Sequence, residues 1–235
     1  MENMLKARLG IVLACTATLV MIPSAAQAAL VANWRMNEGP GAAVMVDSAG
    51  HDNDGRINSV QTGVPGLAGG NAYKFHGPPS YVLVPDSSAL DPVNADITVT
   101  ATVKVANGLI NDDSYEVVRK GLVTSKGGEW KMEIKRSQTK GTVGRLHCVF
   151  KGVEANGSPS LVSVIAGVDV VDDKAHHLRC RKTSTHVFAI VDGQSFSKRK
   201  APGSIANDQP VIIGAKVAGD DEMEGVIDAV KVDIG

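Results

Sequence analysis

The chain has 235 residues, and its 24 lysines and arginines nearly balance its 25 aspartates and glutamates, for a formal net charge of −1. Charges of both signs are interspersed, a pattern that indicates neither a nucleic-acid partner nor binding to a membrane surface. The length that remains after the apolar N-terminal segment suits one domain with a sizeable core.

The N-terminal segment has the pattern of a secretory signal peptide. Two basic residues precede an apolar stretch over residues 11–22, and the small-residue site Ala26-Gln27-Ala28 follows it. This order predicts that residues 1–28 are removed and that residues 29–235 are secreted. A lipid anchor on Cys15 is the alternative, but the apolar stretch before it is very short and continues past it. Neither this stretch nor any later segment has the length of a membrane span.

Short apolar or alternating segments separated by Gly, Asn, Asp and Pro predict strands along the rest of the chain. They cover residues 30–36, 72–75, 81–84, 97–105, 115–119, 130–135, 144–150, 162–168, 177–181, 187–191, 211–213 and 225–234. Many short strands at regular spacing predict one all-β domain over residues 29–235, built as a β-sandwich or jelly roll.

One turn in this pattern is specific. Asp192-Gly193 supplies the positive φ angles of a tight primed turn, so Val191 and Gln194 should close a β-hairpin. The basic run Lys198-Arg199-Lys200 follows this hairpin, and we interpret it as a solvated turn.

Two cysteines remain once the signal peptide is removed. Cys148 is in phase with the apolar residues 146 and 150, and Cys180 is in phase with Leu178, so both should face the core. In an oxidising compartment they are expected to form a disulfide between two strands, which contributes about 3–4 kcal/mol. A zinc site with His147 and His177 is the alternative. The disulfide is favoured because each histidine points to the face opposite its neighbouring cysteine.

The order of several motifs is similar to that of a known family. The motifs are Trp34-Arg35-Met36-Asn37-Glu38-Gly39, Val46-Asp47-Ser48, Tyr73-Lys74-Phe75, Tyr81-Val82-Leu83-Val84, Val191-Asp192-Gly193 and Gly225-Val226-Ile227-Asp228. Together they resemble the laminin G-like secreted domains of the concanavalin A-like lectin/glucanase superfamily. One departure is Ala175-His176-His177, which stands where many members have Trp-His.

This resemblance implies a two-sheet antiparallel jelly roll that binds glycans or extracellular proteins. Some members of the superfamily carry hydrolase or lyase activity, so the resemblance does not imply one ligand or reaction.

Two carboxylates are expected on apolar strand faces. Asp228 shares the parity of Val226, Val230 and Val232, and Glu38 follows the first strand in phase with its apolar residues. A carboxylate facing a core is costly unless it is paired or binds a cation.

The resemblance maps a structural calcium site onto Glu38, Asp47 and Asp228, with help from Asn53, and these oxygen ligands suit calcium. In the alternative interpretation, hydrogen bonds from the backbone or from arginine satisfy the same carboxylates.

Aromatic residues make up only 4% of the chain, which limits the candidates for stacking on sugar rings. Trp130 is a candidate ligand contact, although its parity with Met132 and Ile134 favours a place in the core. Tyr81 and Tyr115, near strand starts, are candidate contacts at the rim.

Enzymatic motifs are not evident. The string Glu-x-Asp-x-x-Glu of the superfamily's glucanases does not occur, and Glu222-Met223-Glu224 precedes a glycine turn. His176 and His177 have no evident carboxylate partner in the sequence. We therefore favour a secreted binding module for a glycan or an extracellular glycoprotein over an atypical polysaccharide hydrolase or lyase, and over a structural or adhesive domain. The oligomeric state stays open.

Overall fold

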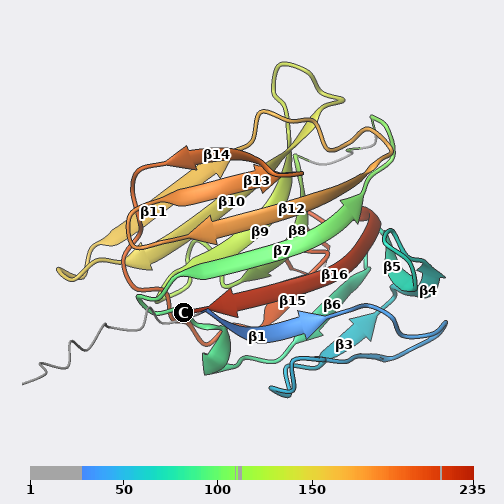
Figure 1. Ribbon diagram of the computed structural model, residues 1–235, viewed down its shortest axis with the longest axis horizontal. Helices are drawn as coiled ribbons and strands as arrows, with labels where there is room; N and C mark the ends of the chain where they lie inside the picture. Colours follow the sequence, from blue (N-terminus) through green and yellow to red (C-terminus); the bar gives the residue numbers. More distant parts are fainter. Residues whose placement is uncertain (1–27, 109, 111–112, 218) are drawn as a thin grey trace, which may run out of the picture.

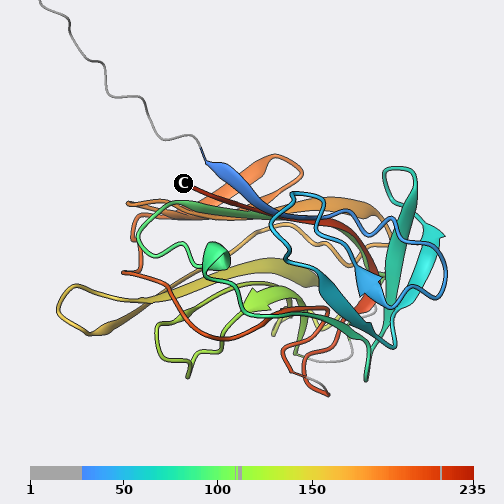
Figure 2. The same cartoon turned by 90° about the horizontal axis from the view of Figure 1, so that it is seen from below.

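The computed structural model describes residues 28–235 except 109, 111, 112 and 218, so Cys15 and nearly all of the predicted signal peptide lie outside the described residues. Two antiparallel sheets of eight strands each form two layers, which Figure 2 shows edge-on. This is the predicted all-β jelly-roll sandwich. No helix among the described residues is long and apolar enough to cross a membrane.

The first sheet, sheet A, has the strand order β14-β13-β12-β7-β16-β5-β4, and β1 also pairs with β16 (Figure 1). Its strands are β1 (Ala29–Trp34), β4 (Gln61–Pro65), β5 (Asn71–His76), β7 (Ile97–Lys104), β12 (Ala175–Lys182), β13 (Val187–Val191), β14 (Gln194–Lys198) and β16 (Glu224–Ile234).

The second sheet, sheet B, has the order β11-β10-β9-β8-β15-β6-β3-β2. Its strands are β2 (Val44–Met45), β3 (Gly55–Asn58), β6 (Tyr81–Val84), β8 (Ser114–Lys120), β9 (Glu129–Arg136), β10 (Gly144–Val153), β11 (Pro159–Ile165) and β15 (Val211–Ile213). The 3-10 helix η1 (Ser88–Leu90) lies between β6 and β7.

The core lies between the inner faces of the two sheets. In β7 every second side chain is buried, as the period of two in its sequence predicts. Trp34 and Phe75 of sheet A and Trp130 and Phe150 of sheet B are all buried there. Each such side chain contributes roughly 1.5–3 kcal/mol through burial.

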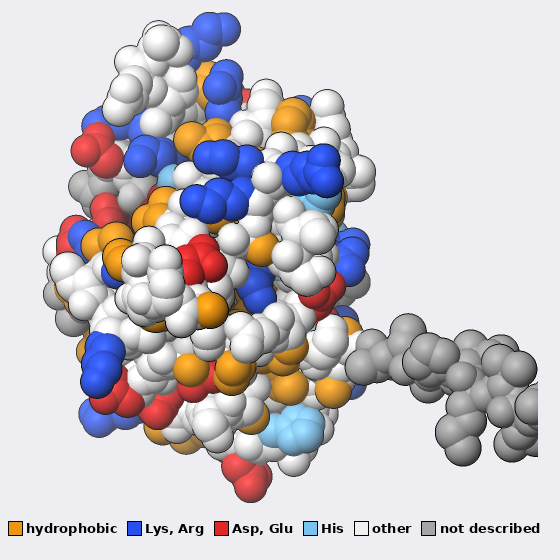
Figure 3. All heavy atoms as spheres, turned by 90° about the vertical axis from the view of Figure 1, so that its left-hand side faces the viewer, with side chains coloured by type: hydrophobic (Ala, Val, Ile, Leu, Met, Phe, Trp, Pro, Cys, Tyr) orange, Lys and Arg blue, Asp and Glu red, His pale blue; other side chains and the backbone are white. Residues whose placement is uncertain are grey.

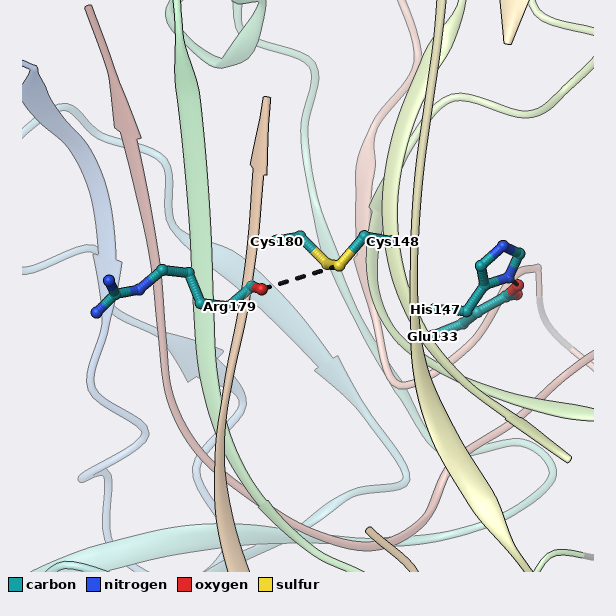
Figure 4. The surroundings of a disulfide bond; sticks show 5 residues. All are labelled: Glu133, His147, Cys148, Arg179 and Cys180. Carbon is teal, nitrogen blue, oxygen red and sulfur yellow. Dashed lines mark hydrogen bonds and ion pairs between the residues drawn. A yellow bond between two sulfur atoms is a disulfide. The ribbon is translucent and has the colours of Figure 1, made fainter. Parts of the chain in front are cut away.

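The predicted disulfide is present and joins the two layers. Cys148 on β10 of sheet B is bonded to Cys180 on β12 of sheet A, with 5.4 Å between their Cα atoms. Figure 4 shows the bond crossing the interior, while His147 points to the outer face of sheet B. This excludes the zinc alternative, because both sulfur atoms are used.

The twelve predicted segments all coincide with strands, and the Asp192-Gly193 hairpin is confirmed, since Val191 pairs with Gln194. Both turn residues have positive φ angles, 50° and 85°. Four short strands lie outside the predicted segments: β2, β3, β4 and β14. The hairpin prediction implied β14, whereas β2, β3 and β4 were missed because they have few apolar residues and no clear alternation.

A β-bulge in β16 corrects one prediction. Asp228 pairs with Thr102 and Lys231 with Thr100, so two residues of β16 lie opposite one residue of β7. Ala229 has a φ of 53° at this point. An extra residue reverses the alternation of side chains. Asp228 therefore points to the outer face of sheet A and not to the core face that Val230 occupies.

Candidate functional site

A row of charged side chains crosses the outer face of sheet B. Glu133 on β9 is the Cα partner of both Glu116 on β8 and His147 on β10. Lys131, two residues before Glu133, is in turn the partner of Arg119. Side chains of cross-strand partners lie on the same face, so these five groups gather on three neighbouring strands.

A second β-bulge places Glu116 and Arg119 on the same face. Residues three apart in a regular strand point to opposite faces. The pairing of β8 with β9 shifts by one residue between Glu116 and Val118, so Val117 and Val118 both face the core. Arg119 consequently returns to the outer face, and its Nη1 lies 3.0 Å from Glu116 Oε2.

The charged groups form a network that is largely closed to solvent. Arg119 also donates to Glu129 Oε2 at 2.6 Å. Lys131 Nζ lies 2.5 Å from Glu133 Oε2 and 3.9 Å from Glu116 Oε2. Arg119, Glu116, Glu129 and Glu133 are all buried. Buried ion pairs of this kind contribute rigidity and geometric definition more reliably than stability.

The carboxyl groups of this network have different proton affinities. Burial raises the pKa of Glu116 to about 8, against the opposing charges of Arg119 and Lys131. Burial also raises the pKa of Glu129. At Glu133 burial acts in the same direction, but hydrogen bonds with His147 and Lys131 outweigh it and lower the pKa to about 2. Glu133 is thus the carboxylate that stays ionised over the widest pH range.

A groove of about 550 Å³ lies over this network. Its floor includes Arg119, Glu129, Lys131 and Glu133. Its walls come from the ends of β8 and β9, from Asp113 just before β8, and from the loops between β8 and β9 and between β15 and β16. The other side chains in these walls are Ser114, Leu122, Val123, Thr124, Lys135, Lys216 and Asp221. The groove thus combines a fixed polar floor with exposed loop residues.

This groove was not predicted from the sequence. Glu129-Trp130-Lys131-Met132-Glu133 places three charged residues on one strand face, and this alternation was a readable signal. The contribution of Glu116 and Arg119 was hidden, because their spacing indicates opposite faces unless the bulge is known.

The aromatic candidates for ligand binding lie elsewhere. Trp130 and Tyr115 have no exposed surface, so neither ring is available to stack on a sugar in this structure. Trp130 instead donates through Nε1 to the backbone oxygen of Leu90, in keeping with the core alternative. Tyr81 is half-buried on β6 and does not line the groove. A ligand contact by Tyr81 stays a prediction.

The calcium candidates accept hydrogen bonds from the protein. Asp47 accepts from the backbone NH groups of Asn33 and Ala49, both at 2.9 Å. Glu38 accepts from the NH of Val46 at 2.9 Å and from the Tyr73 hydroxyl at 2.5 Å.

The remaining two candidates also have partners. Asp228 accepts from the NH groups of Leu67 and Ala68, and the Asn53 side chain donates to the oxygen of Val31. Among the described residues, no group of three or more His, Cys, Asp or Glu is arranged to hold a metal ion. These contacts agree with the alternative interpretation, in which hydrogen bonds from the backbone satisfy the carboxylates.

Calcium binding therefore stays a prediction, with a direct test. A rise in melting temperature on adding calcium that Asp228→Ala abolishes would support it, and an indifferent melting curve would remove it.

The two adjacent histidines differ in their partners. His176 is buried between two carboxylates, with Nε2 2.8 Å from Asp172 and Nδ1 2.7 Å from Asp192. Burial opposes its charged form, but these two carboxylates prevail and raise the pKa of His176. Neither carboxylate partner was evident from the sequence, because Asp172 lies in the loop before β12 and Asp192 in the turn after β13, and the fold brings both to His176. His177 is exposed on the outer face.

Comparisons with known proteins agree with this architecture. A family profile described as the concanavalin A-like lectin/glucanases superfamily matches residues 76–232. No curated protein sequence matches the chain.

Several solved structures share the fold. The binding domain of Paraclostridial Mosquitocidal Protein 1 matches with a TM-score of 0.64 and 16% identity, over 86% of this chain and 48% of that one. The botulinum neurotoxin serotype D ligand-binding domain in complex with N-acetylneuraminic acid matches with a TM-score of 0.60 and 13% identity, over 87% and 47%. The chain thus spans about half the length of these toxin domains.

A third match covers nearly all of a single domain. Domain 4 of AbnA, an extracellular arabinanase of family GH43 from Geobacillus stearothermophilus, solved with arabinotriose, has a TM-score of 0.64 and 15% identity. The match includes 88% of this chain and 93% of that domain. At these identities the likeness shows a shared fold.

Proposed function

Because the chain belongs to the concanavalin A-like lectin/glucanase superfamily, we propose that it is a secreted, non-catalytic module that binds a carbohydrate or the glycan of an extracellular glycoprotein. The observation that carries this proposal is the groove of about 550 Å³ over the buried ion network of sheet B.

The floor of the groove suits sugar hydroxyl groups. Lys131 and Glu133 hold each other in place, so a donor and an acceptor are oriented before a ligand arrives. Preorganised polar groups reduce the entropy that ordering costs on binding. A sugar hydroxyl both donates and accepts, so a floor that alternates in sign can satisfy it without an aromatic platform.

Two of the structural matches support the class of ligand. The matched arabinanase domain was solved with arabinotriose, and the matched neurotoxin domain with N-acetylneuraminic acid. Because these likenesses concern the fold, they support the proposal only together with the groove of this chain.

A blocked groove tests the proposal. Thr124 lines the groove and is exposed, so Thr124→Trp should fill it without touching the ion network. Thr139→Trp, an exposed threonine on the β9–β10 loop that does not line the groove, is the matched control.

Binding is measured on a glycan array and then by calorimetry with each glycan that binds the unmodified protein. We expect Thr124→Trp to weaken binding at least tenfold and Thr139→Trp to leave it unchanged. Equal binding by all three proteins would refute the groove as the site, and no binding to any glycan would refute the proposed ligand class.

One observation favours a second candidate function, an atypical polysaccharide hydrolase or lyase. Glu116 and Glu133 are cross-strand partners whose pKa values are shifted in opposite directions, as in acid and base pairs. Glu116 has no exposed surface, however, which favours binding over catalysis. Release of reducing sugar or unsaturated uronate from a polysaccharide panel, lost in Glu133→Gln, would decide for the enzyme.

A further inference from the structure

The bulge in β16 forms a small polar cavity on the outer face of sheet A, away from the groove. The cavity has a volume of about 300 Å³. Asp228 and Lys231 line it from the two sides of the bulge, and Asn33 and Arg35 line it from β1 and the residues just after it. In a regular strand Asp228 and Lys231 would point to opposite faces, so the cavity exists because of the bulge.

Asn33 lines this cavity and has an unused side-chain acceptor. The residue is only 6% exposed, and its Oδ1 is buried without a hydrogen-bond partner among the described residues. Its backbone is fully engaged, since its NH donates to Asp47 Oδ1 and its oxygen accepts from Ser48. A buried acceptor without a donor is uncommon and costs stability. A turn of the Asn33 side chain that brings Oδ1 to a ligand hydroxyl in the cavity would remove this cost.

The charges around Asn33 favour an anionic ligand. Arg35 and Lys231 are exposed, and neither forms an ion pair with a carboxylate of the described part of the chain. The carboxylate of Asp228 already accepts two backbone NH groups, from the turn at Leu67. The two cations are therefore free to bind a carboxylate or sulfate, and the same cations oppose a metal ion here.

A line of polar side chains leads away from the cavity across sheet A. Lys231 is the Cα partner of Asn33 on one side and of Thr100 on the other, and Thr100 is the partner of Arg179. Figure 4 shows the Arg179 side chain extending away from the interior of the sandwich. Partial desolvation of the otherwise exposed His177, together with the charges of Arg179 and Lys231, lowers its pKa against the opposing charge of Asp192. The two cations therefore contribute a positive field at this face.

We propose that this cavity binds an anionic sugar unit of an acidic polysaccharide, with Arg35 and Lys231 on its carboxylate or sulfate and Asn33 Oδ1 accepting a sugar hydroxyl. The polysaccharide continues over Thr100 toward Arg179. A cavity of this size lies at the lower limit for small-ligand sites, which suits one sugar unit. The site is separate from the groove of sheet B and does not rest on the function proposed for it.

The test uses two acidic polysaccharides and one neutral comparison. Binding of polygalacturonate, of its fully methyl-esterified form and of dextran sulfate is measured by calorimetry for the unmodified protein, Asn33→Ala and Lys231→Gln. Lys126→Gln, an exposed lysine outside both sites, is the matched charge control.

We expect at least one acidic polysaccharide to bind and the methyl ester to bind at least tenfold more weakly. Lys231→Gln and Asn33→Ala should each weaken binding about tenfold. Binding of polygalacturonate but not of dextran sulfate would show that the ligand group is a carboxylate. Binding of dextran sulfate but not of polygalacturonate would show that it is a sulfate. Asn33→Ala also separates a ligand contact from a structural role, because removing an unpaired buried oxygen should leave the melting temperature unchanged or raise it.

Three results would overturn the proposal. The first is that neither acidic polysaccharide binds. The second is that Lys231→Gln and Lys126→Gln lose the same amount of affinity. The third is that Asn33→Ala has a lower melting temperature than the unmodified protein. The groove variant Thr124→Trp should leave this binding intact, so failure at one site can be told from failure at the other.

Discussion

The outer faces of the two sheets use charge in opposite ways. On sheet B most of the charged side chains in the network are buried and paired with one another, as in the contacts of Arg119 with Glu116 and Glu129. On sheet A, Arg35, Arg179 and Lys231 are exposed and turned to solvent. Paired and buried charges provide a rigid pattern of donors and acceptors, whereas exposed and unpaired charges provide an attractive field.

The difference between the faces has a structural cause in each case. On sheet B the bulge in β8 brings Arg119 beside Glu116, so these charged side chains pair and are buried against one another. The outer face of sheet A around Arg179 is open, so its charges are exposed even where Thr100 and Lys231 lie beside them. Lys198 at the end of β14, with Arg199 and Lys200 just after it, is also exposed, as predicted for a solvated turn. Lys and Arg side chains also gather in the upper half of the end of the sandwich that Figure 3 presents.

The sharpest contrast should come from removing one arginine from each face. Arg119→Met leaves two buried carboxylates without their partner and should lower the free energy of unfolding by about 3–5 kcal/mol. Arg179→Met removes an exposed charge and should change the free energy of unfolding by no more than about 0.5 kcal/mol. Urea denaturation measures both values, and equal losses would abolish the distinction between the two faces.

A smaller effect should separate the two carboxylates that face each other on sheet B. Glu133→Gln removes the acceptor of Lys131 and should cost about 1–3 kcal/mol at pH 7. Glu116→Gln should change stability by less than about 1 kcal/mol, because burial already favours the neutral form of this carboxyl. A larger loss in Glu116→Gln than in Glu133→Gln would contradict this order.

The same two groups should give opposite dependences on pH. The pKa of Glu133 is lowered, so its contribution is present above the ordinary value of 4.5 and is lost as the pH falls through about 2. The pKa of Glu116 is raised, so stability falls as the pH rises from 4.5 toward about 8. Stability curves of the two variants against pH, compared with the unmodified protein, measure each contribution.

The smallest effect should distinguish the two histidines of sheet A. The pKa of His176 is raised above 6.5, so its stabilisation is complete below that pH and is lost as the pH rises through the raised value. The pKa of His177 is lowered, so its contribution is lost as the pH falls below 6.5. Melting temperatures of His176→Gln and His177→Gln should therefore both diverge from that of the unmodified protein as the pH falls from 9 to 5, the first becoming lower and the second higher. Divergence in the same direction would contradict the assignment.

Local pattern was sufficient for most of the fold. The alternation in residues 97–105 and 187–191 predicted β7 and β13, and Asp192-Gly193 predicted the hairpin. Cys148 and Cys180 were recognised as core-facing from their parity, and the disulfide followed. These features depend on residues close together in the chain, where side-chain periodicity and turn chemistry act.

Only the tertiary structure decided where the charged side chains lie. Asp228 was assigned to the core from its parity, and the bulge at Ala229 turned it outward into the cavity with Lys231. The bulge at Val117 likewise placed Glu116 beside Arg119. A bulge arises from the pairing of a strand with its neighbours, which lie far away in the sequence, so one extra residue changes the face of every later side chain without a local signal.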